Sequence, residues 1–561
     1  MAEASRSRAK GRPDRREHYP VVIVGAGPTG LTIANLLGVY GVRALVVERN
    51  ASTVAEPRAV SIDDESLRTM QAAGLIDTIL PTVVPGYGSE YRTPGGRCFL
   101  KVNPTGSPYG YPRRNAFRQP TLEAQLRAGL ARFEHVETRF DTALEDFSQD
   151  QTGVVLKLRS AGGDVCEVTA DFLVGADGAS SLVRGNLGLQ LEGETFAEKW
   201  LIVDLEQSPC ESRETQVYCD VRRPCIALPG PDLTRRYEFK LLPGETSEQV
   251  LDPARIQKLL HDYGAHPDSL IKRKTVYTFH ARLAPRWSRG RVFLAGDACH
   301  LTPPFAGQGM NSGIRDAHNL AWKLAWVVLG RAQPGLLASY ERERRDHVGA
   351  MIQLALRMGR IMGPKTRWHG RATQAAFTAL SLWPAARDYF AQMKYKPKPR
   401  FSAGFVVPDD QTAKETPVGR LLPQPMVVDE AGRQKLLDTW LGEGFALVGV
   451  NVEPRVLAGL AAIPAIERLS PKLIRLGRWP DTASCPGVTS LEAKVDSLGR
   501  QCEGRVLLIR PDRYVAGAFR PDEALGFAER LQMLTATPSP VSPANSGRSR
   551  DLRPAAARHA V

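Results

Sequence analysis

The sequence PVVIVGAGPTG, residues 20–30, decides the fold of this chain. An apolar strand runs into a GxGxxG turn, and a helical pattern and a second apolar strand ending at Glu48 follow it. Gly25 allows a tight turn, Gly27 lets the backbone approach a pyrophosphate, and Gly30 lets the helix pack closely on the strand. The helix N-terminus offers free N–H groups and a positive dipole end to phosphates. The stretch therefore predicts a dinucleotide-binding βαβ unit.

Glu48 indicates which dinucleotide this unit holds. It lies at the end of the strand ALVVE and is placed to accept hydrogen bonds from both hydroxyls of an adenosine ribose. A 2′-phosphate would face its carboxylate, which argues against NADP at this site. The sequence contains only one such fingerprint. One dinucleotide is therefore expected to stay bound, and a second must visit by another route.

Two later segments point to a flavin. Residues 171–184, DFLVGADGASSLVR, are an apolar strand followed by a DGxxSxxR motif that begins at Asp177. Residues 291–313, RVFLAGDACHLTPPFAGQGMNSG, are a strand, a Gly-Asp pair and a turn rich in Pro and Gly before a helix. Asp297 can bind a ribityl hydroxyl, and backbone N–H groups of residues 307–311 can face the electron-rich ring of a reduced flavin. For His300, beside this turn, a structural hydrogen bond is expected rather than catalysis.

Composition excludes several other classes of protein. The chain has 561 residues, 43% hydrophobic and 24% charged, as in a globular protein of roughly three or four units. No segment approaches the roughly 20 apolar residues of a membrane span, and the N-terminus lacks the apolar region of a secretion signal. The eight cysteines show no CxxC pair and no metal-ligand spacing, so we expect no metal and a reducing, cytoplasmic location.

The net charge of +14 favours a small anionic ligand over a nucleic acid. Residues 1–19 and 541–561 each carry a net +3, and the remaining excess is spread without a dense Lys/Arg run.

The order of patterns predicts an α/β protein with several units. Residues 1–18 and 536–561 are expected to be disordered tails, and residues 19–395 a Rossmann-like nucleotide domain. Period-two segments such as WLIVDLEQ (200–207) and RRYEFKLL (235–242) predict an antiparallel sheet, inserted at about 85–120 and 190–285 as a substrate domain. The joint YKPKPR, residues 395–400, precedes a small α/β unit at 400–525.

The three motifs together resemble those of the group A flavoprotein aromatic hydroxylases, the family of p-hydroxybenzoate hydroxylase and phenol hydroxylase. The resemblance covers about residues 20–520. It is closest to the members that act on 3-(3-hydroxyphenyl)propanoate, in segments 57–75, 111–123, 235–249, 276–287 and 510–516. It implies tightly bound FAD, transient NADH and a C-terminal thioredoxin-like domain. That domain lacks CxxC, so packing or homodimerisation, not redox chemistry, is its expected use.

The resemblance also implies particular site residues. The expected FAD contacts are Gly25, Gly27, Gly30, Glu48, Arg49, Arg58, Gln119, Asp177, Asp297, Gly309, Met310 and Asn311. The expected catalytic groups near the phenol oxygen are Asp63 or Asp64 and Tyr277. The acidic run at 63–65 is equally well explained as a helix N-terminus with favourable charges, and Tyr277 as a core tyrosine. The turn TPPFA, residues 302–306, departs from the pattern of the closest relatives.

The implied activity is ring hydroxylation in aromatic catabolism, with NADH and O2 as co-substrates. The expected substrate is a phenolic acid, 3-(3-hydroxyphenyl)propanoate or 3-hydroxycinnamate, hydroxylated ortho to its hydroxyl. A simple phenol or a polycyclic polyketide of the anthracycline or tetracycline type is the alternative. A bidentate arginine would bind the substrate carboxylate. The candidates are Arg113, Arg114, Arg222, Arg223, Arg235 and Arg236. The sequence leaves the choice among them open, as it does NADH against NADPH.

Overall fold

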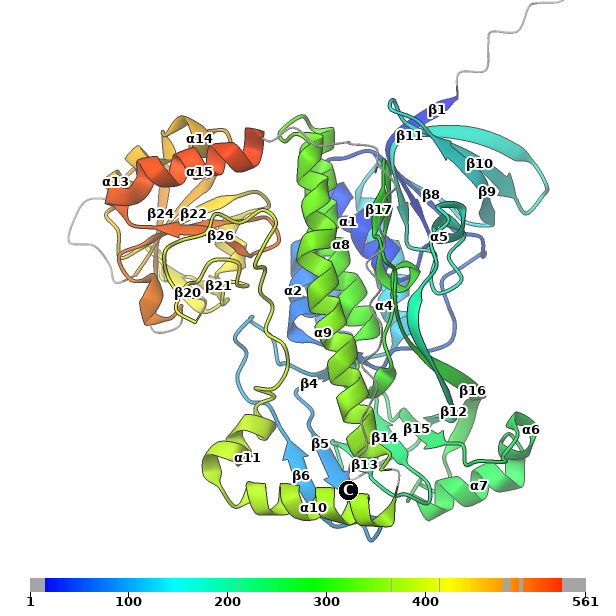
Figure 1. Ribbon diagram of the computed structural model, residues 1–561. Coiled ribbons are helices and arrows are strands. Elements are labelled where there is room, and N and C mark those ends of the chain that lie inside the picture. Colours follow the sequence, from blue (N-terminus) through cyan, green and yellow to red (C-terminus); the bar gives the residue numbers. More distant parts are fainter. Residues whose placement is uncertain are drawn as a thin grey trace, which may run out of the picture.

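The computed structural model describes residues 16–210, 212–364, 366–412, 414–477, 485–493 and 498–536. The expected tails lie outside these residues except for 16–18 and 536. Two long helices, α8 (Gly309–Val328) and α9 (Ser339–Met362), run through the middle of the molecule. Figure 1 shows a first sheet on one side of them, a C-terminal domain on the other and a second sheet beneath.

The first sheet has the Rossmann-like arrangement that the sequence predicts. Its strand order is β17-β18-β11-β1-β2-β8, and β8, β2, β1, β11 and β18 are parallel. The parallel strands are β1 (Glu17–Val24), β2 (Ala44–Val47), β8 (Val136–Arg139), β11 (Val165–Gly175) and β18 (Val292–Leu294). The antiparallel strands are β9 (Thr142–Gln149), β10 (Val154–Ser160) and β17 (Ser288–Arg289).

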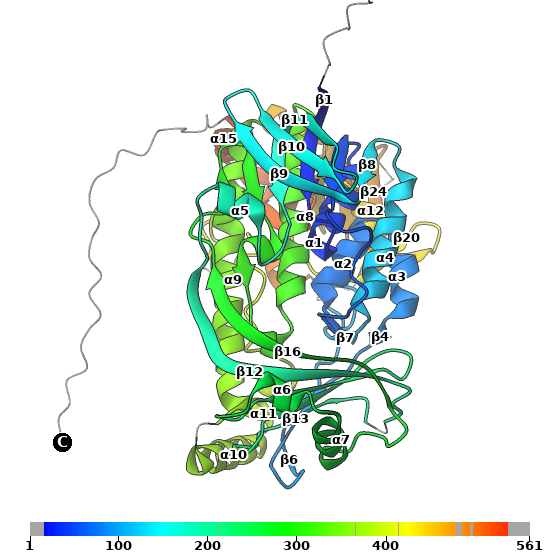
Figure 2. The same cartoon turned by 90° about the vertical axis from the view of Figure 1, so that its right-hand side faces the viewer.

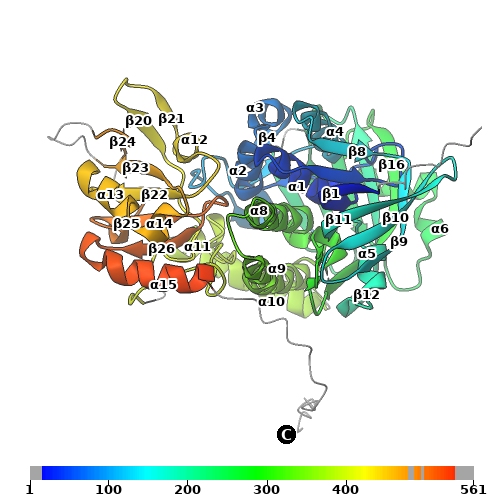
Figure 3. The ribbon, with the colours of Figure 1, turned by 90° about the horizontal axis from the view of Figure 1, so that it is seen from above.

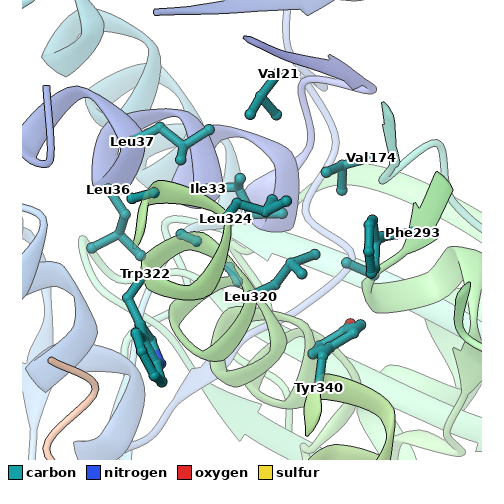
Figure 4. Packing of buried hydrophobic residues seen from close by; sticks show 14 of the residues in the cluster. Val21, Ile33, Leu36, Leu37, Val174, Phe293, Leu320, Trp322, Leu324 and Tyr340 are labelled. Atoms are coloured by element: carbon teal, nitrogen blue, oxygen red, sulfur yellow. The ribbon is translucent and has the colours of Figure 1, made fainter. Parts of the chain in front are cut away.

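Helices bury one face of this sheet. Helix α1 (Pro28–Val39) packs between β1 and α8, where Ile33 and Leu37 meet Leu320 and Leu324 (Figure 4). Three parallel strands are buried and form continuous apolar runs rather than alternating ones: residues 21–24 of β1, β2 and β18. Further helices of this domain are α2 (Asp64–Ala72), α3 (Ile76–Ile79), α4 (Gln119–Gly129) and α5 (Leu182–Asn186).

The second sheet has the order β19-β16-β12-β15-β14-β13-β5-β6. Its strands are β5 (Ser89–Arg92), β6 (Cys98–Val102), β12 (Glu192–Glu206), β13 (Thr215–Tyr218), β14 (Cys225–Pro229), β15 (Arg235–Lys240), β16 (Leu270–Leu283) and β19 (His300–Leu301). Figure 2 shows the long strands β12 and β16 descending from the first domain into this sheet. The sheet is antiparallel as expected, except that β13 and β5 run parallel.

Short helices and a small sheet surround the second sheet. One of its faces packs against α7 (Pro253–Asp262), preceded by α6 (Ser247–Val250), in a separate apolar cluster. Helices α10 (Arg367–Ser381) and α11 (Pro384–Ala391) contact β6. A three-stranded sheet of β3 (Ser61–Ile62), β7 (Asn115–Ala116) and β4 (Val84–Pro85) joins the two domains.

The C-terminal domain has a thioredoxin-like arrangement. Strand β22 pairs in parallel with β23 after a helical connection, then antiparallel with β25, and a β25–β26 hairpin leads into α15. Its strands are β20 (Met426–Asp429), β21 (Gln434–Leu436), β22 (Ala446–Val450), β23 (Lys472–Leu476), β24 (Val488–Glu492), β25 (Val506–Ile509) and β26 (Val515–Phe519). Its helices are α12 (Asp438–Leu441), α13 (Pro454–Ala461), α14 (Pro464–Glu467) and α15 (Ala524–Ala536).

Figure 3 shows the C-terminal domain beside α8 and α9. A buried ionic cluster joins this domain to these helices. Arg510 donates hydrogen bonds to Glu343 of α9 and to Asp512, and Lys323 of α8 contacts the same Glu343 at 2.7 Å. The paired groups are almost fully buried. Such a network is strongly destabilised by loss of one member, so it fastens the domain to the helices. The predicted fold class is confirmed. None of the described helices is both long and apolar enough to cross a membrane.

Candidate active site

A cavity of about 440 Å³ lies between the first domain and the second sheet. The first domain contributes the glycine turn after β1, the loop around Arg58, the DG and GD turns and the start of α8. The second sheet contributes one face of its strands, and α9 adds the methionines 351, 358 and 362. One side of the cavity is therefore rich in backbone N–H groups, and the other is mostly apolar.

The three glycines of the first motif differ in what surrounds them. A Cβ at Gly25, where φ is +107°, would lie 2.4 Å from the carbonyl oxygen of Ala176. A Cβ at Gly30 would lie 2.0 Å from the carbonyl oxygen of Gly25, so both positions require glycine for packing. A Cβ at Gly27 would meet no atom within 4 Å. Gly27 also precedes α1 and lines the cavity, so its backbone is open to a phosphate.

Glu48 is fixed next to this turn. One carboxylate oxygen accepts a hydrogen bond from Ala26 N at 2.9 Å, and the other accepts from the backbone and side-chain nitrogens of Asn50. The carboxylate is thus held at the end of β2, where a ribose beside the glycine turn could reach it. Arg49 is exposed and lies outside the cavity lining.

The DG segment is tied to the GD turn by hydrogen bonds of its own residues. Asp177 accepts a hydrogen bond from Val183 N at 3.1 Å, and its second oxygen has no partner in the described part of the chain. Ser181 caps α5 through Arg184 N. The Arg184 guanidinium donates to Ala298 O at 2.9 Å and to Ala179 O at 2.8 Å, so it ties the DG turn to the GD turn. Arg184, the arginine of the DGxxSxxR motif, therefore has a positioning role.

The GD turn leaves one carboxylate open. Asp297 lines the cavity and is exposed to it, and no described residue donates a hydrogen bond to its side chain. Gly309 and Met310, which begin α8, also line the cavity. The first N–H groups of a helix lack partners within the helix and are available to a ligand. An unpartnered carboxylate and a free helix start together fit the ribityl chain and ring of FAD.

The side chain of Asn311 already has partners within the protein, so the expected flavin contact would use its backbone N–H. Its Oδ1 accepts hydrogen bonds from Asp63 N and Ser66 Oγ, and its Nδ2 donates to Ser61 O and Gly307 O. Only its backbone remains for a flavin.

The loop at residues 57–59 forms another wall. Gln119 Oε1 accepts from Arg58 N at 3.0 Å and from Ala59 N at 2.6 Å, and Arg236 donates to Arg58 O at 2.6 Å. Arg58 and Gln119 both line the cavity. Gln119 therefore acts mainly by holding the loop that presents Arg58.

The structure does not place the expected catalytic groups in the cavity. Asp63 caps α2 and forms ion pairs with Arg315 and Lys396. Burial alone would raise the pKa of Asp63, but these two cations hold it well below its usual range. Asp64 is buried beside it, and burial raises its pKa to about 7. Neither lines the cavity, so the helix N-terminus interpretation fits better.

Tyr277 is likewise absent from the cavity lining. Its hydroxyl accepts a hydrogen bond from Arg273, whose guanidinium also contacts Pro57 O at 2.8 Å. His300 is buried and bonded through Nε2 to Asp316 at 2.6 Å, which confirms the structural role expected for it.

The structure distinguishes the six candidate arginines. Four use their guanidinium elsewhere: Arg113 on Gln392 O, Arg222 on Asp220, Arg223 on Glu245 and Arg235 on Gln216. Arg236 lines the cavity but is paired with Asp204 at 2.6 Å. Arg114 lines the cavity, donates to Ser89 Oγ and has no carboxylate partner within the described residues. Sequence reasoning named Arg114 but could not select it.

Sequence reasoning missed Glu238, which also lines the cavity. The signal was present in RRYEFKLL, because residues 236 and 238 share one face of a strand.

Comparison with known proteins identifies relatives of this chain. A family model described as an FAD binding domain matches residues 18–355, and one described as an HcaD C-terminal domain matches residues 419–534. A 3-(3-hydroxy-phenyl)propionate/3-hydroxycinnamic acid hydroxylase of Escherichia coli (strain SMS-3-5 / SECEC) is 39% identical over 518 residues, 91% of this chain and 93% of the relative.

Solved structures agree on the fold. OxyS anhydrotetracycline hydroxylase from Streptomyces rimosus has a TM-score of 0.71 and 26% identity, covering 93% of this chain and 100% of its own. The flavin-dependent monooxygenase PieE, solved with FAD and substrate, has a TM-score of 0.76 over 94% of this chain and 100% of its own. Its 22% identity carries the fold alone.

The fold, the glycine turn and the open GD turn define a flavoprotein that binds FAD in its first domain. More narrowly, the chain belongs to the family of FAD-dependent aromatic hydroxylases, and it is an FAD monooxygenase.

Proposed function

We propose that this enzyme hydroxylates 3-(3-hydroxyphenyl)propanoate, and 3-hydroxycinnamate, ortho to the existing hydroxyl. The product is the 2,3-dihydroxyphenyl acid, and NADH and O2 are the co-substrates. The names of the E. coli relatives support the substrate class. The observation that carries the proposal in this chain is Arg114, a cation without a carboxylate partner among the described residues of the cavity wall.

The surroundings of Arg114 suit a substrate carboxylate. Its guanidinium lies 4.6 Å from the centre of the Tyr87 ring, and Tyr91 and Tyr395 also line this part of the cavity. Burial raises the pKa of Tyr91 and of Tyr395, so both remain neutral and leave the arginine's charge uncompensated. Arg114 is partly buried. A charge withdrawn from water without an anionic partner is costly, and a bidentate carboxylate would relieve that cost.

The middle of the cavity suits an aromatic ring. Val217, Ile226, Leu228 and Phe279 line it, together with the methionines of α9. Apolar walls exclude water and hold a planar ring while polar groups at the ends fix its orientation. A phenolic acid matches this distribution because its ring is apolar and its two ends are polar.

We propose that Gly27, Arg58 and Asp297 hold FAD, with Glu48 on its ribose and the start of α8 facing its ring. When bound, FAD supplies the redox chemistry: it passes electrons from NADH to O2, so that one oxygen atom becomes electrophilic and the other ends as water. The protein's own part is to bind and orient the phenol and to exclude water. The α8 N-terminus favours negative charge at the flavin ring, since its dipole end is positive.

Several finer features remain part of the proposal. The single dinucleotide fingerprint and the resemblance favour NADH, bound transiently, as donor. We also propose a cytoplasmic enzyme with units at 19–395 and 400–525, the second serving packing or homodimerisation.

The test is product analysis on the purified holoenzyme with NADH and O2. 3-(3-Hydroxyphenyl)propanoate should stimulate NADH oxidation and give the 2,3-dihydroxy acid. Phenol or a tetracycline-type polyketide, the alternative substrates, should be poor because neither has a carboxylate chain for Arg114. Efficient turnover of either one, with only H2O2 formed in the presence of the acid, would refute the substrate assignment. A higher kcat/KM with NADPH would refute the assignment of the donor.

A further inference from the structure

Glu238 is a buried carboxylate without a partner on the substrate side of the cavity. It lies on β15, is 4% exposed and lines the cavity. Within the described ranges, no residue donates a hydrogen bond to it or forms an ion pair with it. Its neighbours on β14 and β12 in the sheet register are the apolar Ile226 and Ile202. The other carboxylates of this sheet region have cations beside them, such as Asp204 with Arg236 and Glu245 with Arg223.

The register of the sheet places Glu238 opposite the Arg114 end of the cavity. Glu238 pairs with Ile226, Ile226 with Val217, and Val217 with Tyr91, in one row across β15, β14, β13 and β5 (Figure 1). All four residues line the cavity. The row thus has a carboxylate at one end, apolar side chains in the middle and Tyr91 at the other end, on the same strand as Ser89, which accepts a hydrogen bond from Arg114. Three strand spacings separate the ends by roughly 14 Å of backbone.

Glu238 also lies near the FAD side of the cavity. Arg236, two residues earlier on the same face, donates hydrogen bonds to the carbonyl oxygens of Pro57 and Arg58. Two residues of a strand span roughly 7 Å, so Glu238 is close to the loop that presents Arg58. A substrate that reaches from Arg114 to Glu238 would therefore bring its hydroxyl end toward the flavin side.

A carboxylate in this position is costly unless a ligand uses it. Burial raises the pKa of Glu238 to about 7, with Arg236 of the same strand lowering it and Asp204 of β12 raising it. A carboxylate with a pKa near the working pH is a suitable general base. Perturbed groups in cavities are also frequent at functional sites.

We propose that Glu238 is the catalytic residue that binds the phenolic hydroxyl and accepts its proton, while Arg114 holds the carboxylate at the opposite end of the same sheet face. This inference rests on the proposed function. Together the two residues set the orientation of the ring and favour substrates in which a phenol and a carboxylate are separated by a short chain.

The proton transfer balances over the reaction. The phenolic O–H bond breaks, its proton moves to Glu238, and the electron pair stays on the oxygen, which makes the ring more reactive toward an electrophilic oxygen. NADH supplies the two electrons, and one atom of O2 enters the ring as a hydroxyl. When the ring becomes aromatic again, its C–H proton goes to the second atom of O2, which takes up a further proton and leaves as water. The neutral Glu238 then returns its proton to the oxygen from which it came.

The experiment compares the parent holoenzyme with Glu238→Gln and, as a matched control, Glu206→Gln. Glu206 lies on the same sheet, outside the cavity, and pairs with Arg118 and Lys272. Glu238→Gln should lower product-forming turnover of 3-(3-hydroxyphenyl)propanoate about 100- to 10,000-fold, the usual contribution of a general base. FAD content and the slow reduction of FAD by NADH without phenol should stay at parent values. More of the NADH consumed should end as H2O2.

Two further measurements separate catalysis from a structural role. The parent's turnover should fall as pH drops below about 7, when Glu238 becomes protonated, and this limb should disappear in Glu238→Gln. A phenolic acid already ionised because of an electron-withdrawing ring substituent should recover much of the lost turnover. Glu238→Gln should also melt at or above the parent temperature at pH 8, because it removes an unpaired buried charge. Glu206→Gln should leave turnover, coupling and the pH profile unchanged.

The outcomes are distinct. Parent-like turnover and pH profile in Glu238→Gln would overturn the inference, as would a lower melting temperature accompanied by loss of FAD. If the parent converts another phenol instead of the acid, the proposed substrate is wrong. The same variants are then compared on that phenol, where unchanged turnover in Glu238→Gln would again overturn the role of Glu238.

Discussion

Replacing Arg114 by methionine should change the substrate preference of the enzyme rather than abolish its chemistry. The guanidinium faces the cavity, and no described residue provides it with an anionic partner. A substrate carboxylate would therefore be the anion that pairs with it. Loss of one member of a buried charge pair in an interface costs about 2–5 kcal/mol. At 1.4 kcal/mol per factor of ten, kcat/KM for 3-(3-hydroxyphenyl)propanoate should fall on the order of 30- to 4,000-fold.

The comparison compound is 3-propylphenol, which keeps the ring and chain but lacks the carboxylate. Arg114→Met should leave its kcat/KM unchanged or raise it, because an apolar side chain replaces an unpaired charge. For the acid, the kcat/KM of Arg114→Lys should lie between those of the parent and of Arg114→Met, since lysine keeps the charge but lacks the planar guanidinium.

The matched control is Arg222→Met, because Arg222 is exposed and already paired with Asp220. Arg222→Met should change kcat/KM for neither the acid nor 3-propylphenol. Equal losses on the acid and on 3-propylphenol in Arg114→Met would show that Arg114 supports the fold or the flavin instead. An unchanged kcat/KM on the acid would exclude it as the carboxylate site.

Three other predictions follow from single contacts. Asp297→Ala should lose FAD affinity in a fluorescence titration while its FAD-free form keeps the parent melting temperature, because no described residue uses this carboxylate; a collapsed apoprotein would contradict this. Arg510→Met should lower the free energy of unfolding in urea by about 3–5 kcal/mol, because Glu343 loses a buried cation, and a negligible loss would contradict the anchoring role. Glu238→Gln should raise that free energy at pH 8 by up to about 3 kcal/mol, since the folded-state pKa of Glu238 is about 7 against an ordinary 4.5. The ionised carboxyl destabilises the fold fully above pH 7, so the gain should shrink as the pH falls. It should vanish below about pH 4.5, where Glu238 is protonated in both the folded and the unfolded state. An equal gain at pH 8 and below pH 4.5 would refute this prediction.

The sequence alone was sufficient to predict the fold of the nucleotide-binding half of the molecule and the position of its glycine turn. The requirements at Gly25 and Gly30 are local or nearly so, because each glycine meets backbone atoms of its own motif or of the neighbouring DG strand. Strand and helix periodicity also predicted the α/β class, since parallel strands covered by helices are continuous apolar runs. The thioredoxin-like order of the C-terminal strands came from resemblance, and the structure agrees with it.

The substrate end of the site could be decided only by the tertiary structure. Asp63 resembles a catalytic acid in the sequence, but Arg315 and Lys396 come from more than 250 residues away to bind it. Arg114 was one of six equivalent candidates until the fold gave partners to the other five. Glu238 and Arg114 become two ends of one cavity only through the register of four strands drawn from distant parts of the chain. A charge becomes functional here when folding buries it without a partner, and that property depends on every residue packed around it.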